Sequence, residues 1–102
     1  MKIKIGINGM GRIGRMVLRS IFENNLNNIE IKHINNKSKT EVCANLIRYD
    51  SIHGKFNHNI DYDDTHLMIN KKKITYSQHS NLEDIKWKKL DVDYVLECTG
   101  KF

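Results

Sequence analysis

Three glycines near the N-terminus have the spacing of a phosphate-binding loop. Gly9, Gly11 and Gly14 form the pattern G-x-G-x-x-G. The first glycine permits a tight turn, the second leaves the backbone accessible to a pyrophosphate, and the third lets a helix pack closely on a strand. The unpaired N–H groups of the first helical turn then face the anion. The pattern predicts a dinucleotide-binding loop if a strand precedes it and a helix follows it.

The flanking residues predict both of these elements. Isoleucines alternate with other residues before the first glycine, which predicts a strand over residues 2–8. Apolar residues at helical spacing after the glycines predict a helix over residues 11–23, and a second alternating run predicts a strand over residues 29–34. Together these segments form a βαβ unit with parallel strands and a right-handed crossover.

The middle of the chain predicts a second helix and then short strands. Thr40 is the expected N-cap of a helix that ends near Arg48, and residues 49–54 are expected to form a loop. Alternating segments then predict small antiparallel strands, because turn residues separate them. The expected strands are residues 55–60, 66–70 and 73–77, with turns at residues 61–64 and 70–72.

The last part of the chain completes the predicted sheet. Residues 81–87 are expected to hold one helical turn, with Trp87 packed in the core. Residues 93–97 predict a final parallel strand beside the first one, with Val95 and Leu96 buried. The predicted fold class is α/β, a partial Rossmann-type doubly wound parallel sheet with a small antiparallel hairpin insertion.

Three stretches of the chain resemble one enzyme family. Residues 5–15, IGINGMGRIGR, are similar to the opening of glyceraldehyde-3-phosphate dehydrogenases, G-x-N-G-F-G-R-I-G-R. Residues 48–56, RYDSIHGKF, resemble the family's K/R-Y-D-S-x-H-G-x-F, and residues 97–102, ECTGKF, resemble its E-x-T-G-x-F. The matches occur in family order. The resemblance therefore identifies residues 1–102 as the N-terminal part of an NAD(P)-binding domain, without the family's catalytic domain.

The resemblance also implies a cofactor site at the carboxyl ends of the strands. In the family, backbone amides at the positions of Arg12 and Ile13 meet the pyrophosphate of the dinucleotide. The alternative for Arg12 is a solvated charge at the start of a helix. The positions implied for cofactor binding are Asn8, Gly9, Gly11, Arg12, Ile13, Gly14, Asn36, Ser80, Thr99, Gly100 and Phe102.

Two of these positions depart from the family pattern. The family has Asn-Asp after the second strand, whereas this chain has Asn at both positions, so Asn36 replaces a carboxylate. An amide can still bind a ribose hydroxyl, but it loses the stronger charge-assisted bond and the repulsion of a 2′-phosphate, which Lys37 and Lys39 could attract. NAD is the expected cofactor and NADP is possible; alternatively, Asn36 serves only as a turn residue. Ser80 stands where the family often has an arginine that contacts the adenosine.

The catalytic residues of the family do not occur in this sequence. The family's nucleophile is a cysteine within S-C-T-T-N, paired with a later histidine, and Cys98 is instead followed by Thr-Gly. The whole enzyme oxidises an aldehyde to an acyl phosphate in glycolysis and passes a hydride to NAD(P). This chain alone is therefore expected to be inactive. The cysteines and histidines also lack metal-ligand spacing, so no metal is expected.

Other interpretations of the sequence stay open. The chain could belong to an erythrose-4-phosphate dehydrogenase of the same family, or be a stand-alone nucleotide-binding or interaction module. The net charge of +5 could suit a nucleic-acid binder, but the lysines are mostly dispersed, which favours solvated charge and no nucleic-acid partner. No apolar run predicts a membrane span or signal peptide, so a cytoplasmic location is expected.

The predicted sheet also implies protein partners. For the whole enzyme, the resemblance implies a homo-oligomer. The last strand would carry an unpaired edge, and both helices would cover the same face of the sheet. We expect a fragment of this kind to self-associate and to become more soluble with the C-terminal catalytic portion of the enzyme.

Overall fold

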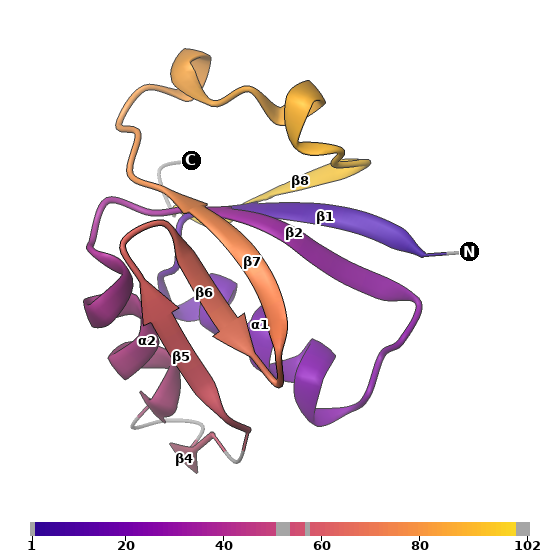
Figure 1. Cartoon of the computed structure of the whole chain (residues 1–102), viewed down its shortest axis with the longest axis vertical. Coiled ribbons are helices and arrows are strands. Elements are labelled where there is room, and N and C mark those ends of the chain that lie inside the picture. The colour runs from indigo at the N-terminus through magenta and orange to yellow at the C-terminus, as the bar shows by residue number, and fades with distance from the viewer. Residues whose placement is uncertain (1, 51–53, 57, 100–102) are drawn as a thin grey trace.

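Six strands form one sheet in the computed structural model, which describes residues 2–50, 54–56 and 58–99. They are β1 (Ile3–Asn8), β2 (Ile29–Asn35), β5 (Ile60–Asp63), β6 (His66–Ile69), β7 (Lys72–Ser77) and β8 (Tyr94–Glu97). Their spatial order is β5-β6-β7-β2-β1-β8 (Figure 1). β7, β2, β1 and β8 pair in parallel, whereas β5 and β6 add an antiparallel hairpin at one side. The predicted α/β Rossmann-type sheet with an antiparallel hairpin is confirmed.

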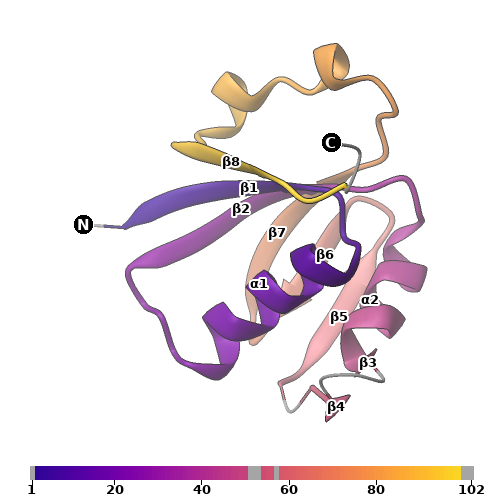
Figure 2. The same cartoon turned by 180° about the vertical axis from the view of Figure 1, so that it is seen from behind.

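Two helices cover the same face of this sheet, as the sequence predicts (Figure 2). They are α1 (Arg12–Glu23) and α2 (Thr40–Arg48). Leu18 of α1 and Ile47 of α2 are fully buried, and they belong to one hydrophobic core with Ile7 and Ile34 of the central strands. None of the helices in the described ranges combines the length and apolar composition that a membrane span needs.

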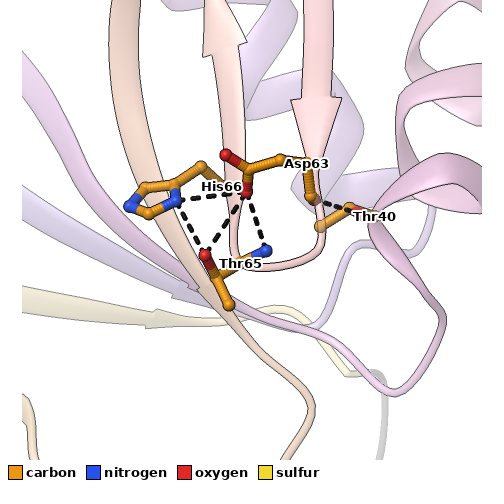
Figure 3. A network of polar contacts seen from close by, with 4 residues as sticks. All are labelled: Thr40, Asp63, Thr65 and His66. Atoms are coloured by element: carbon orange, nitrogen blue, oxygen red, sulfur yellow. Dashed lines mark hydrogen bonds and ion pairs between the residues drawn. The ribbon is translucent and has the colours of Figure 1, made fainter.

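The second helix begins one residue before the predicted position. Lys39, with an extended backbone, is the N-cap of α2, so the assignment of Thr40 as N-cap is wrong. The Thr40 hydroxyl instead donates a hydrogen bond to the Asp63 carbonyl, at 2.7 Å (Figure 3). In the same turn, the Asp63 carboxylate accepts a bond from the Thr65 backbone N–H at 2.9 Å and lies 3.2 Å from Nδ1 of His66. Thr40 thus ties α2 to the β5–β6 hairpin.

The antiparallel region differs from the prediction in its boundaries. The expected strand over residues 55–60 and the expected turn over residues 61–64 are both wrong, because β5 spans Ile60–Asp63. Ile60 and Tyr62 of β5 alternate with Asp61 and Asp63, but aspartates are also typical turn residues, and only Ile60 is buried in this edge strand. Within the expected loop at residues 49–54, β3 (Tyr49–Asp50) pairs antiparallel with β4 (Gly54–Lys55).

The last strand is more exposed than the sequence predicts. β8 lies beside β1 as expected, but in the described part of the chain it pairs with no other strand. Val95 is 40% exposed and Leu96 is partly buried, so the expectation that both are buried is wrong for Val95. β8 is an edge strand with β1 as its neighbour on one side, so its full burial would require further packing partners.

Trp87 is partly buried and lies on the face of the sheet opposite the two helices, so the expectation that it packs in the hydrophobic core is wrong. It begins η2 (Trp87–Leu90), which follows η1 (Leu82–Asp84) in the segment that crosses above this face (Figure 1). A Cβ placed on Gly6 would lie 2.4 Å from the indole ring, so the absence of a side chain at Gly6 makes room for Trp87. The imidazole of His33 meets the indole edge-on, at 5.5 Å between ring centroids.

His33 makes the stability of the fold depend on pH. Burial, with a smaller contribution from His79, lowers the pKa of His33 to about 4. The unfolded chain binds this proton near pH 6.5. Between these values the unfolded state binds more protons than the folded state, so the free energy of unfolding falls as the pH is lowered. The contribution of neutral His33 to the free energy of unfolding is complete above about pH 6.5.

We expect a loss on the order of 2 kcal/mol between about pH 7 and pH 4.5. Urea unfolding at a series of pH values measures it. His33→Gln should remove most of this pH dependence, whereas His58→Gln should retain it. An unfolding free energy that does not vary over this window would contradict the assignment.

Candidate functional site

A cavity of about 450 Å³ opens where the carboxyl ends of the parallel strands meet. Parallel α/β sheets bind ligands at this edge. Six of the predicted cofactor residues line it: Asn8, Gly9, Gly11, Asn36, Ser80 and Thr99. Arg12, Ile13 and Gly14 lie outside the lining, and Gly100 and Phe102 fall outside the described residues.

A different structural constraint explains the glycine at each of the three loop positions. Gly9 has φ +94°, a conformation that side chains disfavour, and a Cβ there would lie 2.8 Å from the backbone of Thr99. A Cβ on Gly14 would lie 2.4 Å from the carbonyl oxygen of Gly9, so Gly14 lets α1 pack against the loop. Gly11 is exposed, and the nearest atom to its would-be Cβ is the Cys98 carbonyl oxygen at 3.7 Å. Gly11 therefore leaves backbone open toward the cavity.

The start of α1 supplies uncommitted hydrogen-bond donors beside the cavity. Gly11 is its N-cap, and within the described residues no side chain caps this helix and no acidic residue lies in its first turn. The first N–H groups of a helix have no partner within the helix, and they form the positive end of its dipole. The side chains of Arg12 and Ile13 are exposed. These two residues can thus contribute to anion binding through their backbone amides.

Asn36 supports the glycine loop directly. Its Oδ1 accepts a hydrogen bond from the backbone N–H of Met10, at 3.1 Å. The side chain thereby links the end of β2 to the turn that follows β1, and it also lines the cavity beside Lys37. Asn36 is therefore more than a turn residue, since it holds the loop while it faces the cavity.

Asn35 joins the ends of the strands beneath the cavity, and it is 3% exposed. Its Nδ2 donates to Asn8 Oδ1 and to the His79 carbonyl, both at 2.9 Å. Its Oδ1 accepts bonds from the His79 backbone N–H at 2.9 Å and from the Ser77 hydroxyl at 2.7 Å. Asn8 Nδ2 then donates to Glu97 Oε2 at 2.8 Å. This amide network spans the carboxyl ends of β8, β1, β2 and β7.

The surroundings of both cysteines disfavour the thiolate form. Burial, followed by the charge of Glu97, raises the pKa of the Cys98 thiol. Burial raises the pKa of Cys43 to about 11. Nucleophilic cysteines instead lie in electropositive surroundings that lower their pKa. In the ranges that the structure describes, no group of three or more His, Cys, Asp or Glu side chains is placed to hold a metal ion.

The cavity also contains residues that the sequence analysis did not select. They are Met10, Arg15, Asn35, Ser38, Leu46, His79 and Glu97. Several follow predicted strands, so the rule that ligands bind at the carboxyl ends of strands could have found them. Leu46 lies in the last turn of α2, and no sequence signal marks it as a cavity residue.

Comparisons with known proteins show the family of this chain. The profile described as "Glyceraldehyde 3-phosphate dehydrogenase, NAD binding domain" matches residues 3–102. Proteins named glyceraldehyde-3-phosphate dehydrogenase are similar to nearly the whole chain. The one from Bacteroides fragilis is 42% identical over 98% of this chain, and the one from Shimwellia blattae is 43% identical over 100%. The one from Thermotoga maritima is 39% identical over 97%.

The match covers the full length of this chain but not of its relatives. The chain spans about 30% of the length of these three proteins. The profile and the relatives match the same residues of this chain, and these residues include the glycine loop at the strand ends. This chain belongs to the glyceraldehyde-3-phosphate dehydrogenase family and corresponds to its NAD-binding domain.

Proposed function

We propose that the cavity at the strand ends binds NAD as the cofactor portion of a phosphorylating glyceraldehyde-3-phosphate dehydrogenase. The observation that carries this proposal is the exposed backbone of Gly11 at the uncapped start of α1. A pyrophosphate needs close access to the backbone and free N–H donors, and this position offers both. The cavity volume of about 450 Å³ also lies within the usual range for ligand sites.

Different residues around the loop bind different parts of the dinucleotide. The amides of Arg12 and Ile13 bind the pyrophosphate, and Asn36 binds the ribose hydroxyls. Ser80 borders the adenosine side, and Thr99, Gly100 and Phe102 are proposed to lie near the cofactor, as the family resemblance implies. When bound, the nicotinamide ring accepts a hydride. The part of this chain is to hold and orient the dinucleotide.

Because of Asn36, we expect the site to discriminate only weakly between NAD and NADP. The amide lacks the negative charge that would repel a 2′-phosphate, and Lys37 lies beside it in the cavity lining. Calorimetric titration of the chain should give measurable binding of both dinucleotides. Asn36→Asp should shift the preference toward NAD by about 1–3 kcal/mol, because a carboxylate forms a charged hydrogen bond with the ribose.

This titration distinguishes failure of the proposed role of Asn36 from failure of the proposed NAD binding. Strong rejection of NADP by the unmodified chain would contradict the role of Asn36 alone. Failure to bind either dinucleotide, in protein that gives a folded circular dichroism spectrum, would contradict the proposed function itself. Asn59→Asp changes an exposed asparagine in the same way and should leave the preference unchanged.

We further propose that catalysis requires a C-terminal portion and, from the family resemblance alone, that it takes place in a homo-oligomer. The length of the relatives supports the first part, as does the raised pKa of Cys98, which disfavours its thiolate. Purified chain should therefore show no aldehyde-dependent and phosphate-dependent reduction of NAD, measured by absorbance. Activity that disappears in Cys98→Ser would overturn this expectation.

A further inference from the structure

A second cavity lies at the end of the sheet away from the glycine loop. Its volume is about 430 Å³, and it is bordered by the end of α1, the following turn, β2 and the β6–β7 hairpin. This volume lies within the usual range for ligand sites, roughly 300–1,000 Å³. The apolar residues of this lining are Ile21, Phe22, Leu26, Ile29, Ile31 and Ile74.

The cavity exists because two neighbouring strands diverge. The ladder between β2 and β7 begins only at His33 and Thr75. Before that point, β2 pairs with β1 and β7 pairs with β6, and in the described part of the chain no ladder joins β2 to β7 (Figure 1). The Thr75 hydroxyl donates to the Lys32 carbonyl at 3.0 Å, where the strands meet. The result is a wedge, with the end of α1 as part of its lining.

Positive charge borders this wedge. Lys2, Lys72 and Lys73 belong to its lining, and all three are exposed. Glu30 is the acidic residue of the lining, and it forms an ion pair with Lys32 at 3.7 Å. Its charge is therefore partly compensated. Apolar side chains and cations thus occur together in one concave site.

We propose that the wedge binds a small amphiphile that carries one carboxylate. The apolar chain packs against the lining near Phe22 and Leu26, which is 37% exposed, and removes that surface from water. The carboxylate lies at the border formed by Lys72 and Lys73. A neutral apolar ligand would leave these cations unused, and a simple anion would leave the apolar surface in water. This site is separate from the dinucleotide cavity, because the two linings share no residue.

Octanoate, below the concentration at which it forms micelles, is the probe for this proposal. In ¹H–¹⁵N correlation spectra of the 102-residue chain, octanoate should shift the amide signals of Phe22, Leu26 and Lys73. Its affinity should exceed that of acetate and that of octanol by about tenfold or more, because each lacks one of the two interactions. Saturation with NAD should leave the octanoate affinity unchanged.

Paired variants distinguish this site from general attraction to a basic protein. The double variant Lys72→Gln and Lys73→Gln should weaken octanoate binding about threefold to tenfold. Lys71→Gln removes the same charge from the same hairpin, outside the lining, and should have no effect. Leu26→Ser should also weaken binding.

Three results would overturn the proposal. The first is equal binding of acetate or octanol. The second is a set of shifts centred on Gly9 and Gly11, which would place octanoate in the dinucleotide cavity. The third is an unchanged affinity in the double lysine variant.

Discussion

Gly11→Val is expected to abolish NAD binding while the chain stays folded. Gly11 is exposed, and a Cβ there makes only ordinary contact with the Cys98 carbonyl oxygen, at 3.7 Å. The branched side chain would instead occupy the space where the pyrophosphate must approach the backbone. We expect the affinity to fall by about a hundredfold or more, which corresponds to about 3 kcal/mol. Isothermal titration calorimetry measures the affinity, and circular dichroism verifies the fold.

A substitution in the same helical turn provides the control. Ile13→Val changes an exposed side chain but keeps the backbone N–H, so it should leave the NAD affinity nearly unchanged. Gly14→Ala should behave differently from both, because its Cβ would meet the Gly9 carbonyl and destabilise the fold by about 1–3 kcal/mol. Equal NAD affinities for Gly11→Val and the unmodified chain would show that this loop does not bind the pyrophosphate.

Asn35→Leu should lower the free energy of unfolding by about 2–4 kcal/mol. The side-chain amide of Asn35 makes four hydrogen bonds, two of them with the backbone N–H and C=O of His79 and one with Asn8. Leucine is similar in size but offers no donor or acceptor, so the buried Asn8 amide and the partly buried groups of Ser77 and His79 lose this partner. Urea unfolding, followed by circular dichroism, measures the change.

An exposed asparagine gives the matched comparison. Asn59→Leu should change the unfolding free energy by less than about 0.5 kcal/mol, as surface substitutions usually do. Unfolding of Asn35→Leu at the same urea concentration as the unmodified chain would contradict the role of the amide network. We also expect weaker NAD binding by the folded fraction of Asn35→Leu, because the network aligns strand ends that carry cavity residues.

Local patterns in the sequence determined the first half of the fold. The alternation before Gly9, the glycine spacing and the helical periodicity after Gly14 all concern neighbouring residues. Each restricts the backbone within a few positions, so the βαβ unit and the position of the loop were predictable. The same patterns placed both helices on one face, because successive parallel crossovers have the same hand.

Long-range contacts decided what the sequence left undetermined. β5 is an edge strand held by pairing with β6, and its two aspartates by themselves are equally compatible with a turn. Trp87 lies on the far face because Gly6, more than eighty positions away in the chain, leaves room for the indole.

The candidate site divides in the same way. The sequence by itself determined the phosphate loop, since the steric requirements of Gly9, Gly11 and Gly14 arise within one turn. Only the tertiary structure decided the role of Asn35, which bonds to residues 27 and 44 positions away, and of Asn36, which accepts a bond from Met10. Asparagine occurs both in turns and in buried hydrogen-bond networks, so the residue type alone does not distinguish these two roles. The strands that converge on Asn35 and Asn36 supply the partners that distinguish these roles.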